Sequence, residues 1–354
     1  MAAATGASAR SGYIASPASD WFFLIAAPLV AILAFVPFAA FPALTFQTQD
    51  LRFRGSFMEG FIQVVIYAHL FIVVFRSHAN PAIFRTHPFR FGVVPLALFA
   101  AVYTSTWALI AIGVLGVWWD VYHSAMQTFG IGRIYDMRAG NDLEAGRRLD
   151  QLMNLLLYAG PILGGASLAL HMQAFSNFSE VGSAFFTSIP ARAESHSREL
   201  TLAVFALGIP FTIYYVWSYW RLQRSGYRVS LQKASLYAIL AVVSIGCWGF
   251  NSFGEAFFVM NFFHATQYFF IVWHMEGTGL TQRSGFARLP HGRYLVLVVF
   301  LVIGLGYGIW TTGAWPWPAL QPSRRGLAAT LLTVSILHFW YDGFIWSVRK
   351  GQVR

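Results

Sequence analysis

The sequence predicts an all-α, polytopic integral membrane protein: a bundle of about ten transmembrane helices with both termini in the cytoplasm. Three observations predict this class. Of the 354 residues, 57% are hydrophobic, only 11% are charged, and long apolar runs recur along the whole chain. Because charged residues make up roughly 25% of an ordinary soluble domain, this chain has too few of them to cover a soluble fold. The composition therefore excludes a soluble enzyme and a disordered tail.

The basic charge of the chain fits the same class. The net charge of +10 is expected in a membrane protein, because Lys and Arg hold cytoplasmic loops in place. We therefore expect no nucleic acid among the partners. The single cysteine, Cys247, excludes intrachain disulfides and thiolate metal clusters. It lies in an apolar run and is expected to be a buried thiol.

Composition divides the chain into three parts. Residues 1–20, rich in Ala, Ser and Gly, are expected to form a flexible N-terminal segment, residues 21–348 a single transmembrane domain, and residues 349–354 a C-terminal tail. The first apolar run is longer than the apolar core of a cleaved signal peptide, which has roughly 7–15 residues. We therefore expect that run to be the first spanning helix.

Ten apolar runs are long enough to span a bilayer, which takes about 20 helical residues. They cover residues 21–44, 57–75, 91–110, 112–135, 150–172, 200–222, 233–251, 253–275, 294–312 and 327–348. The stretches 91–135 and 233–275 each predict two helices joined by a tight turn. We place these turns near Gly113 and near Asn251.

The distribution of basic residues orients the ten runs. With a cytoplasmic N-terminus, 18 of the 24 Lys and Arg residues fall in segments on the inner side. The six on the outer side are Arg52, Arg54, Arg192, Arg198, Arg324 and Arg325. Because basic residues accumulate on the cytoplasmic side of membrane proteins, this split favours cytoplasmic termini.

Four of the ten histidines lie inside predicted spans, one in each of four helices: His69, His123, His264 and His338. An ionisable side chain inside a bilayer is costly, so each of these is a candidate functional residue. All four helices run from outside to inside, and each histidine lies 11 or 12 residues from the start of its span. At about 1.5 Å per residue, the imidazoles should share one depth near the midplane. We predict that they bind one metal ion, the alternative being four separate interhelical hydrogen bonds.

Polar residues accompany two of these histidines at helical spacing. Asp120 and Gln127 share a helix face with His123, and Asp342 follows His338 by four residues. Carboxylates and amides commonly orient metal-bound imidazoles. We therefore expect Asp342, Gln127 and Asp120 to orient the ligands or to relay protons.

Five further residues are secondary candidates for the same site. They are Gln267 and Tyr268, within one turn of His264; His78, in a loop rich in Pro, Arg and His; His274, at an inner helix end; and Glu255, near an outer end. Glu255 lies about 180° around the helix from His264, which makes it a less favoured ligand.

The ligand types favour a mononuclear non-haem iron site. Imidazole and carboxylate without thiolate suit iron, copper or zinc, and iron(II) with open positions activates O₂. Haem is the competitor: two haems would need paired histidines on one helix, and a single haem would leave two of the four histidines unexplained. Phenylalanines crowd around His264, which suits a lipophilic substrate such as a lipid or polyene.

Three short segments resemble the Brp/Blh β-carotene dioxygenase family. They are the run Phe263–Phe269 (FHATQYF) with Val272-Trp273, the run His338–Asp342 (HFWYD), and the His123 segment followed by Phe129-Gly130. Together they cover about 40 of the 354 residues. The resemblance implies a polytopic fold whose intramembrane histidines hold one iron and whose activity is that of an oxygenase. Tyr268 differs from the family pattern, which has a second histidine one turn after the first.

Two classes of function fit these observations. The first is an integral membrane oxidoreductase of the oxygenase or desaturase type, expected in a bacterial inner membrane, with O₂, a lipophilic substrate and an electron donor as partners. The second is a proton-coupled transporter whose histidines titrate near neutral pH. A single-haem quinol protein ranks below both.

Overall fold

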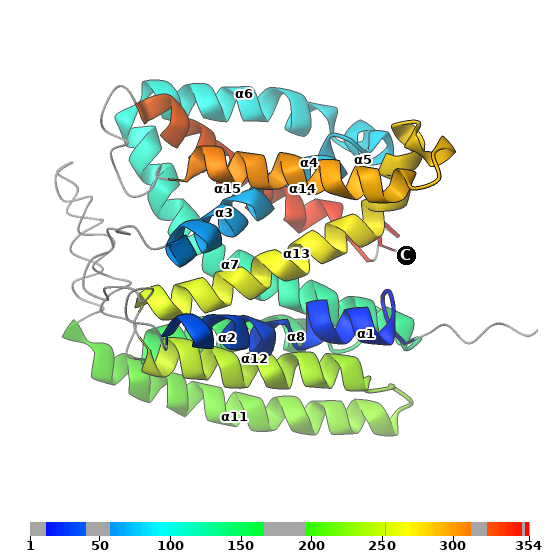
Figure 1. Ribbon diagram of the computed structural model, residues 1–354. Coiled ribbons are helices and arrows are strands. Elements are labelled where there is room, and N and C mark those ends of the chain that lie inside the picture. The colour runs from blue at the N-terminus through cyan, green and yellow to red at the C-terminus, as the bar shows by residue number, and fades with distance from the viewer. Residues whose placement is uncertain are drawn as a thin grey trace, which may run out of the picture.

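The structure is a computed structural model, and it describes residues 12–39, 57–165, 195–251, 253–312, 324–348 and 351–353. Every regular element in these residues is a helix, in agreement with the predicted class. The long helices lie roughly side by side and alternate in direction (Figure 1). Cys247 is buried on one of them, as expected.

The helices follow the chain in a simple order. They are α1 (Pro17–Asp20), the π-helical turn η1 (Trp21–Ile25), α2 (Ala27–Ala39), α3 (Phe57–Phe71), α4 (Val73–Ser77), α5 (Pro81–Thr86), α6 (Pro88–Thr104), α7 (Thr106–Arg138), α8 (Arg147–Gly164), α11 (Ser197–Arg224), α12 (Leu231–Phe250), α13 (Phe253–Arg283), the 3₁₀ turn η4 (Phe286–Arg288), α14 (Gly292–Thr311) and α15 (Arg325–Ile345).

Seven helical segments of the described chain are long and apolar enough to cross a membrane: Gly60–Ser77, Thr106–Arg138, Ser197–Arg224, Leu231–Phe250, Ala256–Arg283, Gly292–Thr311 and Arg325–Ile345. The pair Pro17–Ile25 and Ala27–Phe35, bent by 63°, would make an eighth. The protein is therefore a helical membrane protein with several membrane-compatible helices. Two other predicted spans, residues 91–110 and 150–172, correspond to the shorter apolar helix α6 and to α8, which begins with charged residues.

One of the two predicted turns is wrong, because the first long apolar stretch breaks at Ser105 and not at Gly113. Ser105 has extended backbone angles, and its hydroxyl accepts a hydrogen bond from the Ala108 amide, which caps the start of α7. A serine at this position satisfies an amide that the helix leaves unpaired, whereas Gly113 lies inside α7. The second turn is confirmed, because α12 ends at Asn251 with extended backbone.

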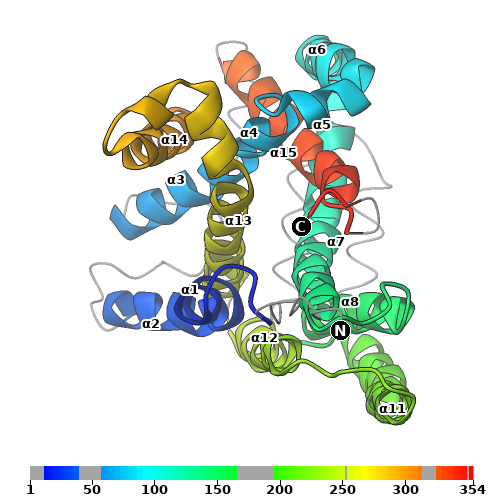
Figure 2. The same ribbon diagram turned by 90° about the vertical axis from the view of Figure 1, so that its right-hand side faces the viewer.

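Apolar side chains cover the outside of the bundle as well as its core. Leu207 on α11 is 74% exposed, Leu96 on α6 is 72% exposed and Val242 on α12 is 69% exposed. In water such a surface would be unfavourable, because large exposed apolar patches favour association. In hydrocarbon it is favourable, which fits a lipid environment. Viewed along the bundle, α13 and α7 lie near its middle, with α3 and α15 beside them (Figure 2).

Part of the N-terminal segment that was expected to be flexible packs against the bundle. Asp20 is buried, and its carboxylate accepts hydrogen bonds from the Ile14 amide at 2.6 Å and from the Ala15 amide at 2.9 Å. The Tyr135 hydroxyl of α7 donates to the same carboxylate at 3.0 Å. These bonds hold α1 against α7.

A buried network of charged side chains ties α7, α8, α11 and α12 together at one end of the bundle. Its charged members, Arg133, Asp136, Asp150 and Lys233, are 0–4% exposed. Asp150 accepts from Arg133 at 2.8 Å and from Lys233 at 2.6 Å, and its other oxygen accepts from Tyr215 and Tyr219. Two acids balance two bases, so the network carries no net charge.

Removal of one acid from this network should be strongly destabilising. Asp150→Ala leaves Arg133 and Lys233 to share Asp136 alone, and an uncompensated buried charge costs about 3–5 kcal/mol. We expect a markedly lower thermal unfolding midpoint in detergent. Asp142→Ala, in the exposed loop before α8, is the control and should change stability by no more than about 0.5 kcal/mol. Equal midpoints for the two variants would contradict the structural role of the network.

Candidate metal centre

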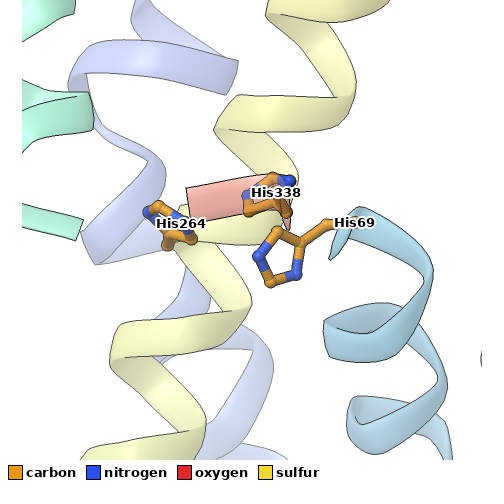
Figure 3. Close-up of side chains that lie close together, drawn as sticks. All are labelled: His69, His264 and His338. Atoms are coloured by element: carbon orange, nitrogen blue, oxygen red, sulfur yellow. The ribbon is translucent and has the colours of Figure 1, made fainter. Parts of the chain in front are cut away.

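Four helices bring the four intramembrane histidines to one place. His69 comes from α3, His123 from α7, His264 from α13 and His338 from α15. Their exposed fractions are 1%, 3%, 0% and 0%, respectively. Figure 3 shows the rings of His69, His264 and His338 pointing toward one another from three different helices. The shared depth expected from the sequence thus coincides with a shared location in the fold.

The four rings form a closed circuit. Ring centroids are 5.1 Å apart between His69 and His264, and 5.0 Å apart between His264 and His123. The circuit closes with 4.7 Å between His123 and His338 and 5.1 Å between His338 and His69. Every ring meets its two neighbours edge to face. Four imidazoles therefore surround a single centre.

These separations match what one metal ion requires. An ion bonded to an imidazole nitrogen at roughly 2.0–2.1 Å lies about 3.2 Å from the ring centroid. Neighbouring centroids are then about 4.6 Å apart in a square arrangement and about 5.3 Å apart in a tetrahedral one. The four observed distances, 4.7–5.1 Å, fall between these limits. The centroid spacing therefore leaves room for one ion, while the ring nitrogens close enough to share it fall into two groups: His69, His264 and His338 form one, and His123 joins His338 and Asp342 in the other.

Several ring nitrogens at this centre have no hydrogen-bond partner among the described residues. They are both nitrogens of His69, both of His264, and Nδ1 of His338. Backbone groups of Ile66 and Leu70 approach His69 and His338, respectively, but outside hydrogen-bond geometry. A buried polar group left unpaired costs about 1–3 kcal/mol, so such a concentration of them calls for an explanation. A neutral imidazole has one lone pair, and coordination of a cation would use one such lone pair on each ring.

Asp342 lies beside the imidazoles. Its Oδ2 atom is 3.8 Å from Nε2 of His338 and 3.9 Å from Nε2 of His123. These two nitrogens are themselves only 3.0 Å apart. Two groups can each hold a metal ion, with ligand atoms within 4.8 Å of one another: His69, His264 and His338, and His123, His338 and Asp342. Asp342 therefore lies beside two of the four imidazoles, where its carboxylate could either ligate an ion or support the histidines.

The other oxygen of Asp342 is held by two aromatic side chains. Its Oδ1 atom accepts from the Tyr268 hydroxyl at 2.7 Å and from the Trp346 indole at 2.9 Å. Tyr268 also packs edge to face against His338, with ring centroids 4.6 Å apart. The carboxylate is thus fixed with Oδ2 toward the histidines. Sequence reasoning missed Trp346, although its spacing of four residues from Asp342 places both on one helix face.

The two glutamines stabilise the backbone around His264. Gln127 donates to the His264 carbonyl at 3.0 Å and to the Gln267 side chain at 3.1 Å. Gln267, fully buried, donates in turn to the Leu24 carbonyl at 2.7 Å. These bonds join α7, α13 and η1 at the turn that carries His264. Gln127 therefore orients the helix of one histidine, whereas the sequence placed it beside the ring of His123.

The remaining candidates do not join the centre. Asp120 is half-buried, and its electrostatic neighbour is Tyr158 of α8. His78 bonds the Ser77 hydroxyl at 2.7 Å and the Phe91 carbonyl at 3.0 Å, and burial lowers its pKa. It is therefore neutral at pH 7 and joins α4 to α6.

His274 and Glu255 complete this set. His274 stacks on Phe270, with ring centroids 6.0 Å apart, and it belongs to neither group of candidate ligands. The side chain of Glu255 lies outside the described residues.

A cavity of about 280 Å³ reaches this centre between α7 and α15. His123, Tyr268 and Asp342 lie in its wall, and so does Trp346. Apolar side chains of α7 and α15 make up much of the remaining lining, among them Met126 and Phe339. The cavity provides access for a small molecule to the metal-binding side chains, and no sequence pattern had indicated it.

No known protein family, curated protein or solved structure matches the chain.

Proposed function

We propose that the protein is an integral membrane oxidoreductase of the oxygenase or desaturase type, with one non-haem iron held by four histidines. The observation that carries the proposal is the closed circuit of four buried imidazoles whose centroid separations suit one ion. Nitrogen and oxygen ligands without thiolate suit iron. The local resemblance to the Brp/Blh family points the same way.

The chain's own residues have distinct tasks in this proposal. His69, His123, His264 and His338 hold the ion, and bound iron supplies the activation of O₂. Asp342 binds or releases a proton at Oδ2, while Tyr268 fixes its other oxygen. The cavity between α7 and α15 admits the lipophilic substrate. Burial of the imidazoles limits the access of water to the reacting atoms. The proposed enzyme also needs an electron donor as a partner.

The metal content of the purified protein tests this proposal directly. We expect about one iron per chain by mass spectrometry, and an optical spectrum without the absorption bands of haem. Protein purified after growth in iron-depleted medium should lose activity and regain it when iron(II) is added. A preparation free of both metal and haem that remains active would refute the proposal.

We also propose that the chain spans a bacterial inner membrane ten times, with both termini in the cytoplasm. The excess of basic residues on the inner side supports this arrangement. The arrangement of the helices supports it too, because the loops at residues 139–146, 225–230 and 284–291 lie at the same end of the bundle (Figure 1).

Reporter fusions test this topology. A green fluorescent protein fused at the C-terminus should fluoresce, and alkaline phosphatase inserted in residues 173–199 should be active, because the phosphatase folds only outside the cytoplasm. Phosphatase inserted in residues 225–230 serves as the inactive control. An inactive reporter in residues 173–199 together with an active one in residues 225–230 would reverse the orientation.

A proton-coupled carrier is the second candidate function. The observation that favours it is the pair of helices Pro17–Ile25 and Ala27–Phe35, bent by 63°, because broken helices form binding sites in transporters. This break lies close to the centre, since Leu24 accepts a hydrogen bond from Gln267. A carrier would contain no stoichiometric metal, so the same metal measurement separates the two functions.

A further inference from the structure

The cavity that reaches the metal centre has a cationic end. On α8, Arg147 and Gln151 lie four residues apart on one helix face, and both line the cavity. The guanidinium of Arg147 lies over the Phe129 ring, 5.6 Å from its centroid. Among the described residues, the Gln151 amide makes a weak contact, 3.7 Å from the Met126 sulfur. These two side chains together can hold an anionic group.

Of the two arginines that line the cavity, Arg147 is the one whose charge is available to a ligand. Arg133 also lines the cavity, but its guanidinium is committed to Asp136 at 2.6 Å and to Asp150 at 2.8 Å. It further donates to the Leu143 carbonyl at 2.7 Å. Arg147 is half-buried, so a charge-assisted hydrogen bond to it would be partly shielded from water.

The wall of the cavity is mainly apolar between this end and the metal-binding side chains. Met126, Phe129 and Ile131 of α7 lie in this part of the wall, with Gln127 as a polar exception. Phe129 follows His123 by six residues, which places the Arg147 end about 9 Å further along the helix axis than His123. An anion held at Arg147 therefore positions a carbon in the middle of its chain, and not its polar group, beside His123 and Asp342.

The shape of the cavity favours a ligand with one chain. Its volume is about 280 Å³, and it runs along α7 from His123 to the Arg147 end. A single alkyl or polyene chain of about ten carbons can lie along it with its acidic group at Arg147.

We propose that this cavity binds a single-chain amphiphile with an anionic end group, whose head is held by Arg147 and Gln151 and whose mid-chain carbon lies beside Asp342. The claim that this amphiphile is the substrate rests on the proposed oxidoreductase function. The claim that the amphiphile binds here rests on the cavity alone.

Photolabelling tests the binding. The probes are a decanoate and a decanol that each carry a diazirine in mid-chain, applied to the full-length protein in detergent. In the wild type, the decanoate should label peptides of α7 and α15 that line the cavity, more strongly than the decanol does. Arg147→Gln should reduce labelling of these peptides by decanoate at least about tenfold, because a hydrogen bond to a charged group is lost, and should leave labelling by decanol unchanged.

Two further variants sharpen this test. Arg148→Gln removes the neighbouring exposed charge and should leave labelling by decanoate unchanged, whereas Arg147→Lys should retain most of it. Equal labelling by both probes in the wild type, or an equal loss of both in Arg147→Gln, would overturn the proposed binding site. So would labelling confined to the lipid-facing side chains of α11 and α14.

Iron measured in the same preparations separates this inference from the proposed function. Labelling that depends on Arg147 in protein that contains no metal would support the proposed binding site and refute the proposed oxidoreductase function. Protein that contains iron but shows no such labelling would support the metal centre and refute the proposed substrate class.

Discussion

His264→Ala is expected to reduce metal binding by more than about 100-fold, because a direct ligand contributes more than the supporting groups, whose loss costs about 10–100-fold. His264 is fully buried, and its ring lies 5.1 Å from that of His69 and 5.0 Å from that of His123. Alanine at this position leaves an apolar gap in the circuit. Metal content by mass spectrometry after purification in detergent measures the effect.

The same helix provides a matched control. His274 lies ten residues after His264 on α13, outside both groups of candidate ligands. His274→Ala should retain the full metal content, and circular dichroism should show that both variants keep their helices. If the four imidazoles are equivalent ligands, alanine at position 69, 123 or 338 should have the same effect as alanine at position 264. Full metal content in His264→Ala would refute a centre built from four histidines.

Asp342→Ala is expected to weaken metal binding by about 10–100-fold without loss of the fold in detergent. The carboxylate stands 3.8 Å from Nε2 of His338 and 3.9 Å from Nε2 of His123, so its removal takes negative charge away from the ion. Asp342→Asn keeps the shape and the possible bonds to Tyr268 and Trp346, and it should show most of the loss, since the charge is the main contribution. A titration with iron(II) under anaerobic conditions measures the affinity.

Tyr268→Phe separates the position of Asp342 from its charge. The variant keeps the ring against His338 but removes the hydroxyl that holds Oδ1 at 2.7 Å. We expect a smaller loss of affinity than in Asp342→Ala, because Trp346 still holds the carboxylate. Should Asp342→Ala instead shift the pH dependence of transport in metal-free protein, the carrier would be the correct function.

The membrane class and the depth of the histidines could be predicted from the sequence because both depend on local properties. Apolar content over about 20 residues decides whether a helix suits a bilayer. A constant rise per residue then places His69, His123, His264 and His338 at one level. The boundary at Asn251 was likewise predictable, whereas α7 begins after the capping residue Ser105, so α6 ends earlier than expected.

Which helix faces meet could not be predicted, because spacing along one helix leaves open both its rotation about its axis and the identity of its neighbours. Packing between helices brings the four imidazole rings together, directs Asp342 toward two of them, and directs Gln127 to the His264 carbonyl. Packing also opens the cavity between α7 and α15, and it pairs Asp150 with Lys233, 83 residues away. These contacts join distant parts of the chain, and their free energy depends on the fit of whole surfaces, which no local pattern of residues contains.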